Sequence, residues 1–180
     1  MNVFLATDAY KVGHKPMYPK GTTKVYSNFT PRSNKYAPPG CDKVVSFGQQ
    51  MVMQQIKEMF DETFFKKDKA EVCGEIKTEY SMLLNTDVDV SHIEALHDLG
   101  YLPIKVKALP EGTKVPMGVP VLTIYNTVDE FFWLTNFLET LISNLLWKPM
   151  TSATIADAYK RKLTEWCLKT DKDAIDFVNF

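Results

Sequence analysis

Arginine is scarce in this 180-residue chain. The sequence has 21 basic residues, and only Arg32 and Arg161 among them are arginines. A guanidinium holds phosphate with two parallel hydrogen bonds, whereas a lysine ammonium acts as a point charge. We therefore expect a phosphate-handling site built from this chain alone to be incomplete. The net charge of −1 argues against a general nucleic-acid-binding protein, which carries a basic excess.

Cysteines and long apolar runs are also few. Cys41, Cys73 and Cys167 lie far apart and form no CxxC pair, which predicts free thiols in a reducing compartment and neither a disulfide framework nor a zinc site. No apolar run approaches the roughly 20 residues that span a bilayer. The start of the chain lacks a basic region and reaches Asp8 too early for a signal peptide. The sequence therefore predicts a cytoplasmic protein that does not enter a membrane.

Common catalytic motifs are absent. The chain contains no Walker loop, GxGxxG, GxSxG, HExxH or EF-hand loop. His92 and His97 are five residues apart, which places them on different faces of a helix. We expect both to be surface residues and not metal ligands, so no metal site is predicted from the residues present.

The first half of the chain has the pattern of short strands and amphipathic helices. Residues 1–23 indicate an irregular or short helical opening, 24–29 a strand, and 30–42 a proline-rich loop. Helices are predicted at 47–60, at 68–85 behind the cap Asp68, and from the capping box Ser91–Glu94 to the stop at Gly100.

The second half adds a β-rich segment and long helices. Residues 104–108 and 119–125 are predicted as two antiparallel strands, because the turn residues 111–118 join them. A helix follows the capping box Thr127–Glu130 and is apolar around most of its circumference to Trp147, which predicts burial against several neighbours. Another helix is expected over 151–169. The fold class is therefore α+β, with a mainly antiparallel sheet and packed helices.

The last seven residues, 174–180, alternate apolar and polar side chains like a strand. Natural termini more often trail off as polar residues. We therefore interpret residues 1–180 as one amino-terminal region of a longer protein.

The densest polar cluster lies at residues 7–14. Asp8, Tyr10, Lys11 and His14 offer a carboxylate, a phenol ring and two potential cations. A tyrosine ring stacks on flat heteroaromatic rings, and a carboxylate accepts hydrogen bonds from amides or ribose hydroxyls. The alternative interpretation is an ordinary helix start, with Thr7 or Asp8 as the cap and Tyr10 half-buried.

Arg32 follows the predicted strand 24–29 directly and lies in a loop. This is a common position for a phosphate contact. The alternative is a solvated loop arginine with no ligand.

Several blocks in the correct order resemble the amino-terminal part of the type II nicotinate/nicotinamide phosphoribosyltransferase family, in particular its nicotinamide phosphoribosyltransferases. These blocks span nearly the whole chain and are weakest between about 60 and 100. They are Leu5-Ala6-Thr7-Asp8-Ala9-Tyr10-Lys11-x-x-His14-x-x-x-Tyr18-Pro19, Lys24-Val25-Tyr26-Ser27-x-Phe29-x-x-Arg32, Phe47-Gly48-x-Gln50, Leu102-Pro103-Ile104-x-Val106-Lys107-Ala108-x-Pro110-Glu111-Gly112, Trp133-Leu134-Thr135-Asn136-x-x-Glu139-Thr140 and Ala153-Thr154.

The resemblance implies transfer of phosphoribosyl from phosphoribosyl pyrophosphate to nicotinamide, giving nicotinamide mononucleotide and pyrophosphate, with Mg²⁺ sharing the phosphate charge. It implies a homodimer with active sites at the interface. By resemblance Tyr10 stacks on the nicotinamide ring, Asp8 lies beside that ring, and Arg32 faces the phosphates. The family's catalytic histidine, its acidic pair and most of its arginines are expected beyond Phe180, where the family continues into an incomplete α/β-barrel-like half.

Two other functions fit part of the same pattern. Nicotinate phosphoribosyltransferases share a Thr-Asp-x-Tyr opening, although the sequence Tyr10-Lys11-x-x-His14 followed by Tyr18-Pro19 fits the nicotinamide type better. A non-catalytic helical interaction module is the alternative outside this class of enzyme.

Overall fold

The computed structural model describes residues 2–179 and has an α+β fold. Three short 3-10 helices lie at the start of the chain, η1 Val3–Leu5, η2 Ala9–Gly13 and η3 Lys15–Met17. Two more lie later, η5 Asp129–Phe131 and η6 Lys172–Ala174. The longer helical elements are α1 Gln49–Phe60, continued by the π-helix η4 Asp61–Phe65, then α2 Lys69–Leu84, α3 Ser91–Leu99, α4 Leu134–Phe137, α5 Glu139–Thr170 and α6 Ile175–Val178. The irregular or short helical opening predicted for residues 1–23 is confirmed for residues 2–23, since Met1 lies outside the described residues.

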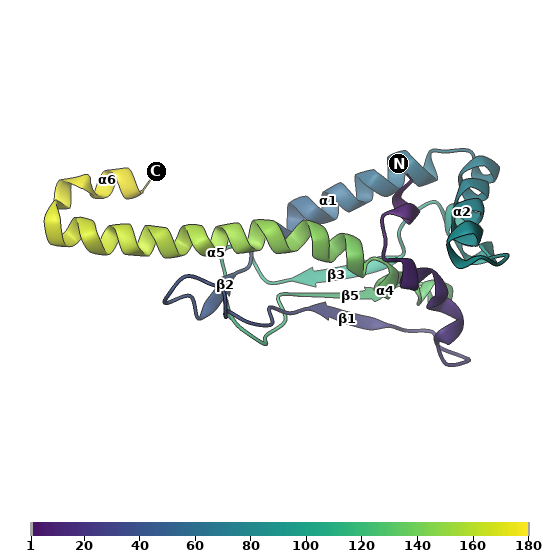
Figure 1. The fold of residues 1–180 in the computed structure, drawn as a ribbon, viewed down its shortest axis with the longest axis horizontal. Coiled ribbons are helices and arrows are strands. Elements are labelled where there is room, and N and C mark those ends of the chain that lie inside the picture. The colour runs from purple at the N-terminus through teal and green to yellow at the C-terminus, as the bar shows by residue number, and fades with distance from the viewer. Residues whose placement is uncertain (1, 180) are drawn as a thin grey trace.

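Two small antiparallel sheets hold the strands. The larger sheet has the order β1-β5-β3 and consists of β1 Tyr26–Phe29, β5 Leu122–Asn126 and β3 Ile104–Ala108. It lies along one side of α5 (Figure 1). The three predicted strands are confirmed, with β5 starting three residues later than expected. A second pair, β2 Lys43–Val45 with β4 Lys114–Pro116, was not predicted.

The helix α5 is the longest element, at 32 residues. The sequence analysis predicts two helices here, one that ends near Trp147 and one over 151–169. Proline removes a backbone donor and ends many helices. The structure instead continues the helix through Pro149. It also breaks the first predicted helix into η5, α4 and the start of α5. Within residues 2–179, no helix combines the length and the apolar character needed to cross a membrane.

Pro149 lies where the start of α1 approaches α5 closely. Gly48 precedes α1 with φ +89°, and a Cβ at this position would lie 2.8 Å from Pro149 Cβ and Cγ. The proline ring therefore packs directly on a backbone that carries no side chain. Glu111 completes this helix start, since its Oε1 accepts hydrogen bonds from the Gly48 and Gln50 amides at 3.1 and 3.2 Å.

Phe4 lies at the centre of the hydrophobic core. Its side chain is fully buried, and its ring centroid is 4.7 Å from that of Phe64, 5.2 Å from Phe137 and 5.6 Å from Phe60. The Tyr80 hydroxyl donates a 2.6 Å hydrogen bond to the Phe4 carbonyl. These contacts fix η1 between the π-helix, α2 and α4. Burial of an aromatic side chain of this size stabilises the fold by about 2–3 kcal/mol.

Helix caps were predicted with mixed success. Asp68 caps α2 by accepting a 3.0 Å hydrogen bond from the Glu71 amide, and Gly100 ends α3 in the left-handed conformation, both as predicted. The capping box at Ser91 is wrong, because Ser91 already lies inside α3 and donates its hydroxyl to Asp89. The capping box at Thr127 is also wrong, since the residue that precedes η5 is Val128 and it has no side-chain cap.

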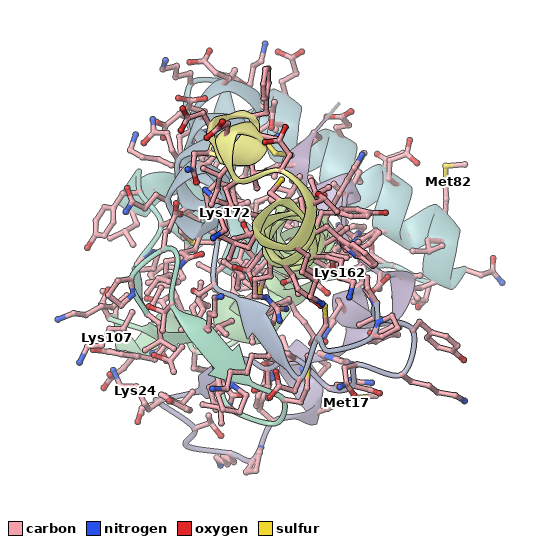
Figure 2. The ribbon with its side chains drawn as sticks, turned by 90° about the vertical axis from the view of Figure 1, so that its left-hand side faces the viewer. Met17, Lys24, Met82, Lys107, Lys162 and Lys172 are labelled. Atoms are coloured by element: carbon pink, nitrogen blue, oxygen red, sulfur yellow. The ribbon has the colours of Figure 1, made fainter. Side chains whose placement is uncertain are left out.

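The strand predicted over 174–180 is wrong for the residues that the structure describes. Residues 172–178 form η6 and α6, which fold back against the end of α5 (Figures 1 and 2). Phe180 lies outside the described residues. A strand needs a neighbouring sheet edge to pair its amide and carbonyl groups, and the part of the chain described here brings no such edge to this segment.

The second half of α5 is poorly covered. No residue of α5 after Thr154 is buried, and large apolar side chains are exposed there: Tyr159, Leu163, Trp166 and Leu168. Figure 2 views the molecule from this end, with Lys162 and Lys172 beside the helix. The burial predicted for the helix up to Trp147 is confirmed for most of its apolar residues, although Trp147 itself is 55% exposed.

Substituting Gly48 tests the contact between α1 and α5. Gly48→Ala places a Cβ against Pro149 and puts a residue with a side chain in the left-handed region. We expect the free energy of unfolding to fall by roughly 2–4 kcal/mol, measured by urea denaturation. The control is Gly74→Ala inside α2, where no atom lies within 4 Å of the added Cβ, and a slight gain of about 0.5–1 kcal/mol is expected. Equal stability of the two variants would contradict this account.

Candidate functional site

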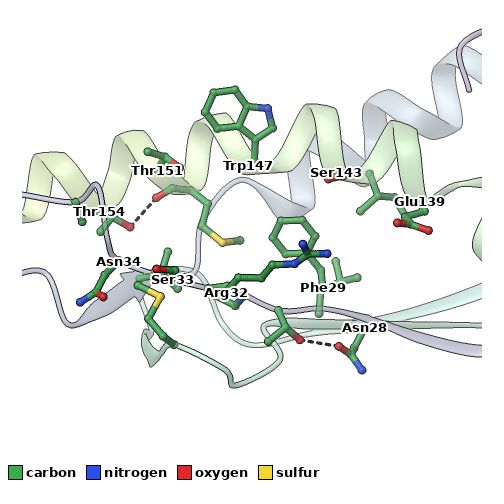
Figure 3. Close-up of a pocket in the computed structure, with 18 of the residues that line it drawn as sticks. Asn28, Phe29, Arg32, Ser33, Asn34, Glu139, Ser143, Trp147, Thr151 and Thr154 are labelled. Atoms are coloured by element: carbon green, nitrogen blue, oxygen red, sulfur yellow. Dashed lines mark hydrogen bonds between the residues drawn. The ribbon is translucent and has the colours of Figure 1, made fainter. Parts of the chain in front are cut away.

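A large pocket lies between α5 on one side and β1 with the loop that follows it on the other. Its volume is about 1040 Å³. The floor is apolar and is formed from both sheets and α5, by Phe29, Val44, Leu122, Ile124, Ile142 and Met150. Nearly half of the lining residues are polar, and Arg32 and Glu139 are the two charged ones (Figure 3). A concave site that combines apolar side chains with polar groups that can orient a ligand is the usual form of a small-molecule site.

Arg32 reaches into this pocket. Figure 3 shows its side chain extending from the loop after β1 into the space beneath α5, beside Phe29. Within residues 2–179 no carboxylate lies at ion-pair distance from Arg32, whereas Arg161 is paired with Asp157 at 3.1 Å. The Arg32 guanidinium is therefore available to an anion that enters the pocket, and its contact with phosphate stays a prediction.

Asp8 and Tyr10 lie together at the amino-terminal end of α5. The Thr140 hydroxyl donates a 2.7 Å hydrogen bond to Asp8 Oδ2, and the Asp8 amide lies 3.3 Å from Thr140 Oγ1. The Tyr10 hydroxyl donates a 3.3 Å hydrogen bond to the same Asp8 oxygen. The Tyr10 ring centroid lies 5.2 Å from that of His14.

The alternative interpretation of this segment, a capped helix start with a half-buried Tyr10, does not describe what the structure shows. Asp8 precedes η2 without making a side-chain cap hydrogen bond. Tyr10 is 59% exposed and not half-buried. An exposed ring held by neighbouring polar groups is open to stacking by a ligand, which the alternative of a core tyrosine does not offer.

Lys11 connects this cluster to the pocket. Its side chain is only 4% exposed, and its ammonium pairs with the Glu139 carboxylate, which lines the pocket. The same ammonium lies 5.2 Å from the centroid of the Tyr10 ring. Asp8 and Tyr10 therefore lie at the Glu139 end of the pocket and do not line it themselves, while Arg32 lies within it.

Sequence reasoning did not predict the roles of Lys11 and Glu139. Lys11 was counted only as a potential cation, and nothing in its surroundings in the sequence indicated that it would be buried. A signal for Glu139 was present, because it is the only charged residue between Phe131 and Trp147. A single carboxylate on an otherwise apolar segment requires a partner when the segment packs into a core.

His92 and His97 correct the expectation of two surface residues, because both are half-buried. His92 packs edge-on against Trp133 with ring centroids 4.7 Å apart, and burial lowers the pKa of its imidazole to about 4, helped by the nearby Lys15 and opposed by Asp89. His97 Nε2 lies 3.0 Å from the Lys67 carbonyl. Among residues 2–179, no three His, Cys, Asp or Glu side chains are grouped so that they could hold a metal ion.

The chain matches known proteins along nearly all of its length. Residues 2–106 match the family described as "Nicotinamide phosphoribosyltransferase, N-terminal domain". A nicotinamide phosphoribosyltransferase of Acinetobacter baylyi is 52% identical over 175 residues, which cover 94% of this chain and 35% of that protein. One of Xanthomonas campestris is 28% identical, over 96% of this chain and 34% of that protein. The chain thus spans about a third of the length of these curated relatives.

A solved structure shares the fold. The crystal structure of human nicotinic acid phosphoribosyltransferase aligns with a TM-score of 0.56 and 18% identity, over 88% of this chain and 28% of that one. The fold is therefore that of one part of a pyridine-base phosphoribosyltransferase. Within this class, the sequence match identifies the particular family: the chain belongs to the nicotinamide phosphoribosyltransferase N-terminal domain family.

The half-buried His92 predicts a dependence of stability on pH. The unfolded chain binds a proton at His92 near the ordinary pKa of 6.5, whereas the folded chain does so only near pH 4. The folded state is therefore not penalised above pH 6.5, and it loses stability as the pH falls from 6.5 to 4. We expect a loss on the order of 2 kcal/mol from this group.

The measurement is a series of urea denaturations between pH 7 and pH 4 on the wild type and on His92→Phe, which keeps a ring but does not titrate. Because carboxylates also titrate near the lower limit, the difference between the two proteins is the informative quantity. Parallel pH profiles for both proteins would show that His92 is not the group responsible.

Proposed function

We propose that this chain is the amino-terminal third of an enzyme that transfers phosphoribosyl from phosphoribosyl pyrophosphate to nicotinamide. The products are nicotinamide mononucleotide and pyrophosphate. The observation that carries the proposal is the likeness to the nicotinamide phosphoribosyltransferase of Acinetobacter baylyi over nearly the whole chain. The pocket supports it, since Arg32 lines it and, among residues 2–179, no carboxylate pairs with the Arg32 guanidinium.

Three residues of this chain are assigned to substrate. We propose that the Tyr10 ring stacks on nicotinamide, because it is exposed and its hydroxyl is directed to Asp8. Asp8 lies beside that ring, and its carboxylate can accept a hydrogen bond from an amide or a ribose hydroxyl. Arg32 faces the phosphate groups, which a guanidinium binds better than an ammonium does.

The reaction needs groups that these residues do not supply. Departure of pyrophosphate leaves an oxocarbenium-like sugar and a growing negative charge, so catalysis depends on positioning and on charge stabilisation. Asp8, Tyr10 and Arg32 contribute positioning. We propose that the catalytic residues lie beyond Phe180, in a barrel-like half, and that two subunits share each active site.

Magnesium and location are part of the same proposal. Mg²⁺ binds phosphates readily, but the described residues offer no group of ligands that would hold it, so we derive no step through the metal and expect it to enter with phosphoribosyl pyrophosphate. The cytoplasmic location predicted from the three unpaired cysteines remains a prediction.

The activity is tested on the full-length protein that carries this chain. With phosphoribosyl pyrophosphate and Mg²⁺, we expect nicotinamide mononucleotide to form from nicotinamide, and kcat/KM for nicotinate to be lower. Residues 1–180 alone should give no detectable product, because most of the charge-stabilising groups are missing. A full-length protein that prefers nicotinate would establish the nicotinate alternative, and one inactive with both bases would favour the non-catalytic module. Turnover by residues 1–180 would show that the essential chemistry lies within them.

Tyr10→Ala tests the stacking contact in the full-length protein. Loss of an aromatic stacking partner is worth about 0.5–1.5 kcal/mol beyond area burial, so we expect the nicotinamide KM to rise several-fold to roughly tenfold. Tyr10→Phe should be nearly silent, because stacking requires the ring and not the hydroxyl. Steady-state kinetics and thermal melts on both variants decide the matter. A destabilised Tyr10→Ala with an unchanged KM would show that Tyr10 is only structural.

A further inference from the structure

A partly buried ion pair joins the opening segment of the chain to α5. The Lys11 side chain is 4% exposed, while its partner Glu139 is 62% exposed and lines the pocket. Burying an ammonium costs several kcal/mol before pairing, and a methionine of similar length would pack in its place at no such cost. The charge of Lys11 is therefore not explained by packing alone.

The helix that carries Lys11 needs external support. The 3-10 helix η2 has five residues and no side-chain cap, and short 3-10 helices have poor hydrogen-bond geometry of their own. Two ties from η2 and the residue before it reach adjacent positions of α5: Lys11 pairs with Glu139, and Asp8 accepts a hydrogen bond from Thr140. The orientation of η2 therefore depends on the first turn of α5.

The same ammonium also contacts the residue proposed to stack on the base. Lys11 Nζ lies 5.2 Å from the Tyr10 ring centroid, and the His14 ring lies beside that ring. Since Tyr10 is 59% exposed, core packing does not determine where its ring points. Its neighbours in the cluster do, and among them Lys11 is the one held in place by α5 through an ion pair.

We infer that Lys11 and Glu139 are a positioning pair: Glu139 fixes the Lys11 ammonium, and the ammonium holds the Tyr10 ring at the end of the pocket, ready to stack on a flat heteroaromatic base. This inference rests on the proposed function for the identity of the base. It assigns to Glu139 a role through Lys11 and not a contact with the reacting atoms.

The test uses the full-length protein with Lys11→Met and Glu139→Gln, each of which removes one charge and keeps the side-chain length. We expect each to raise the nicotinamide KM by roughly three- to tenfold, as a displaced binding group does, with kcat and the KM for phosphoribosyl pyrophosphate within about twofold. Lys11→Arg should restore most of the loss. The control is Lys69→Met, which breaks the exposed pair with Asp98 and should change nothing.

A double-mutant cycle separates positioning from a general structural effect. If Lys11 acts through the Tyr10 ring, Lys11→Met should add almost nothing to the KM of Tyr10→Ala, because coupled residues are not additive. The same factor in both backgrounds would overturn the inference, as would a lower melting temperature with an unchanged KM.

A second measurement does not depend on activity. Backbone amide exchange at residues 9–14 should be faster in Lys11→Met and Glu139→Gln than in the wild type and in Lys69→Met, because η2 loses its tie to α5. Unchanged exchange would overturn the inference even if the wild type proved inactive. An inactive wild type with faster exchange in both variants would remove the proposed function while leaving the pair as the tie that positions Tyr10.

Discussion

The arrangement of the amino-terminal segment depends on the packing of the Phe4 ring in the hydrophobic core. Residues 2–23 contain only short 3-10 helices, and such helices are not stable without tertiary contacts. The Phe4 ring packs among Phe60, Phe64 and Phe137, which brings three separate elements around one side chain. Once Phe4 is fixed, Asp8 and Lys11 are within reach of the first turn of α5. These two residues in turn contact the exposed Tyr10 side chain.

The helix α5 serves the core and the site at the same time. Ile142 and Met150 on one stretch of the helix form part of the pocket floor, while Glu139 and Thr140 at its start hold the Lys11 and Asp8 side chains. Any shift of α5 along its axis therefore moves the pocket wall and the Tyr10 support together. The contact between Gly48 and Pro149 limits such a shift, because the two surfaces meet without an intervening side chain.

The sequence correctly predicted those helix ends that are determined by neighbouring residues in the chain. Asp68 and Gly100 fix the ends of helices through short-range hydrogen bonds and left-handed backbone, and both were read from the sequence. The passage of α5 through Pro149 was not predicted, because proline ordinarily interrupts a helix, and the contact of its ring with the distant Gly48 cannot be read from the local sequence. The strands β2 and β4 have three residues each, which is too short for a period to be recognised. Asp8, Tyr10 and Arg32 were proposed as site residues from residue type and resemblance, whereas the burial of Lys11 depends on α5, where its partner Glu139 lies 128 residues away.

The distribution of charge accounts for what this part of the protein can and cannot do. Of the two arginines, Arg161 is committed to Asp157 on the far half of α5, and Arg32 alone reaches the pocket. Lys11 lies near the site, but its charge is already balanced by Glu139. A single free guanidinium orients one phosphate group, whereas a departing pyrophosphate develops charge over several oxygens. The proposed reaction therefore takes the remaining positive charge from residues outside this chain.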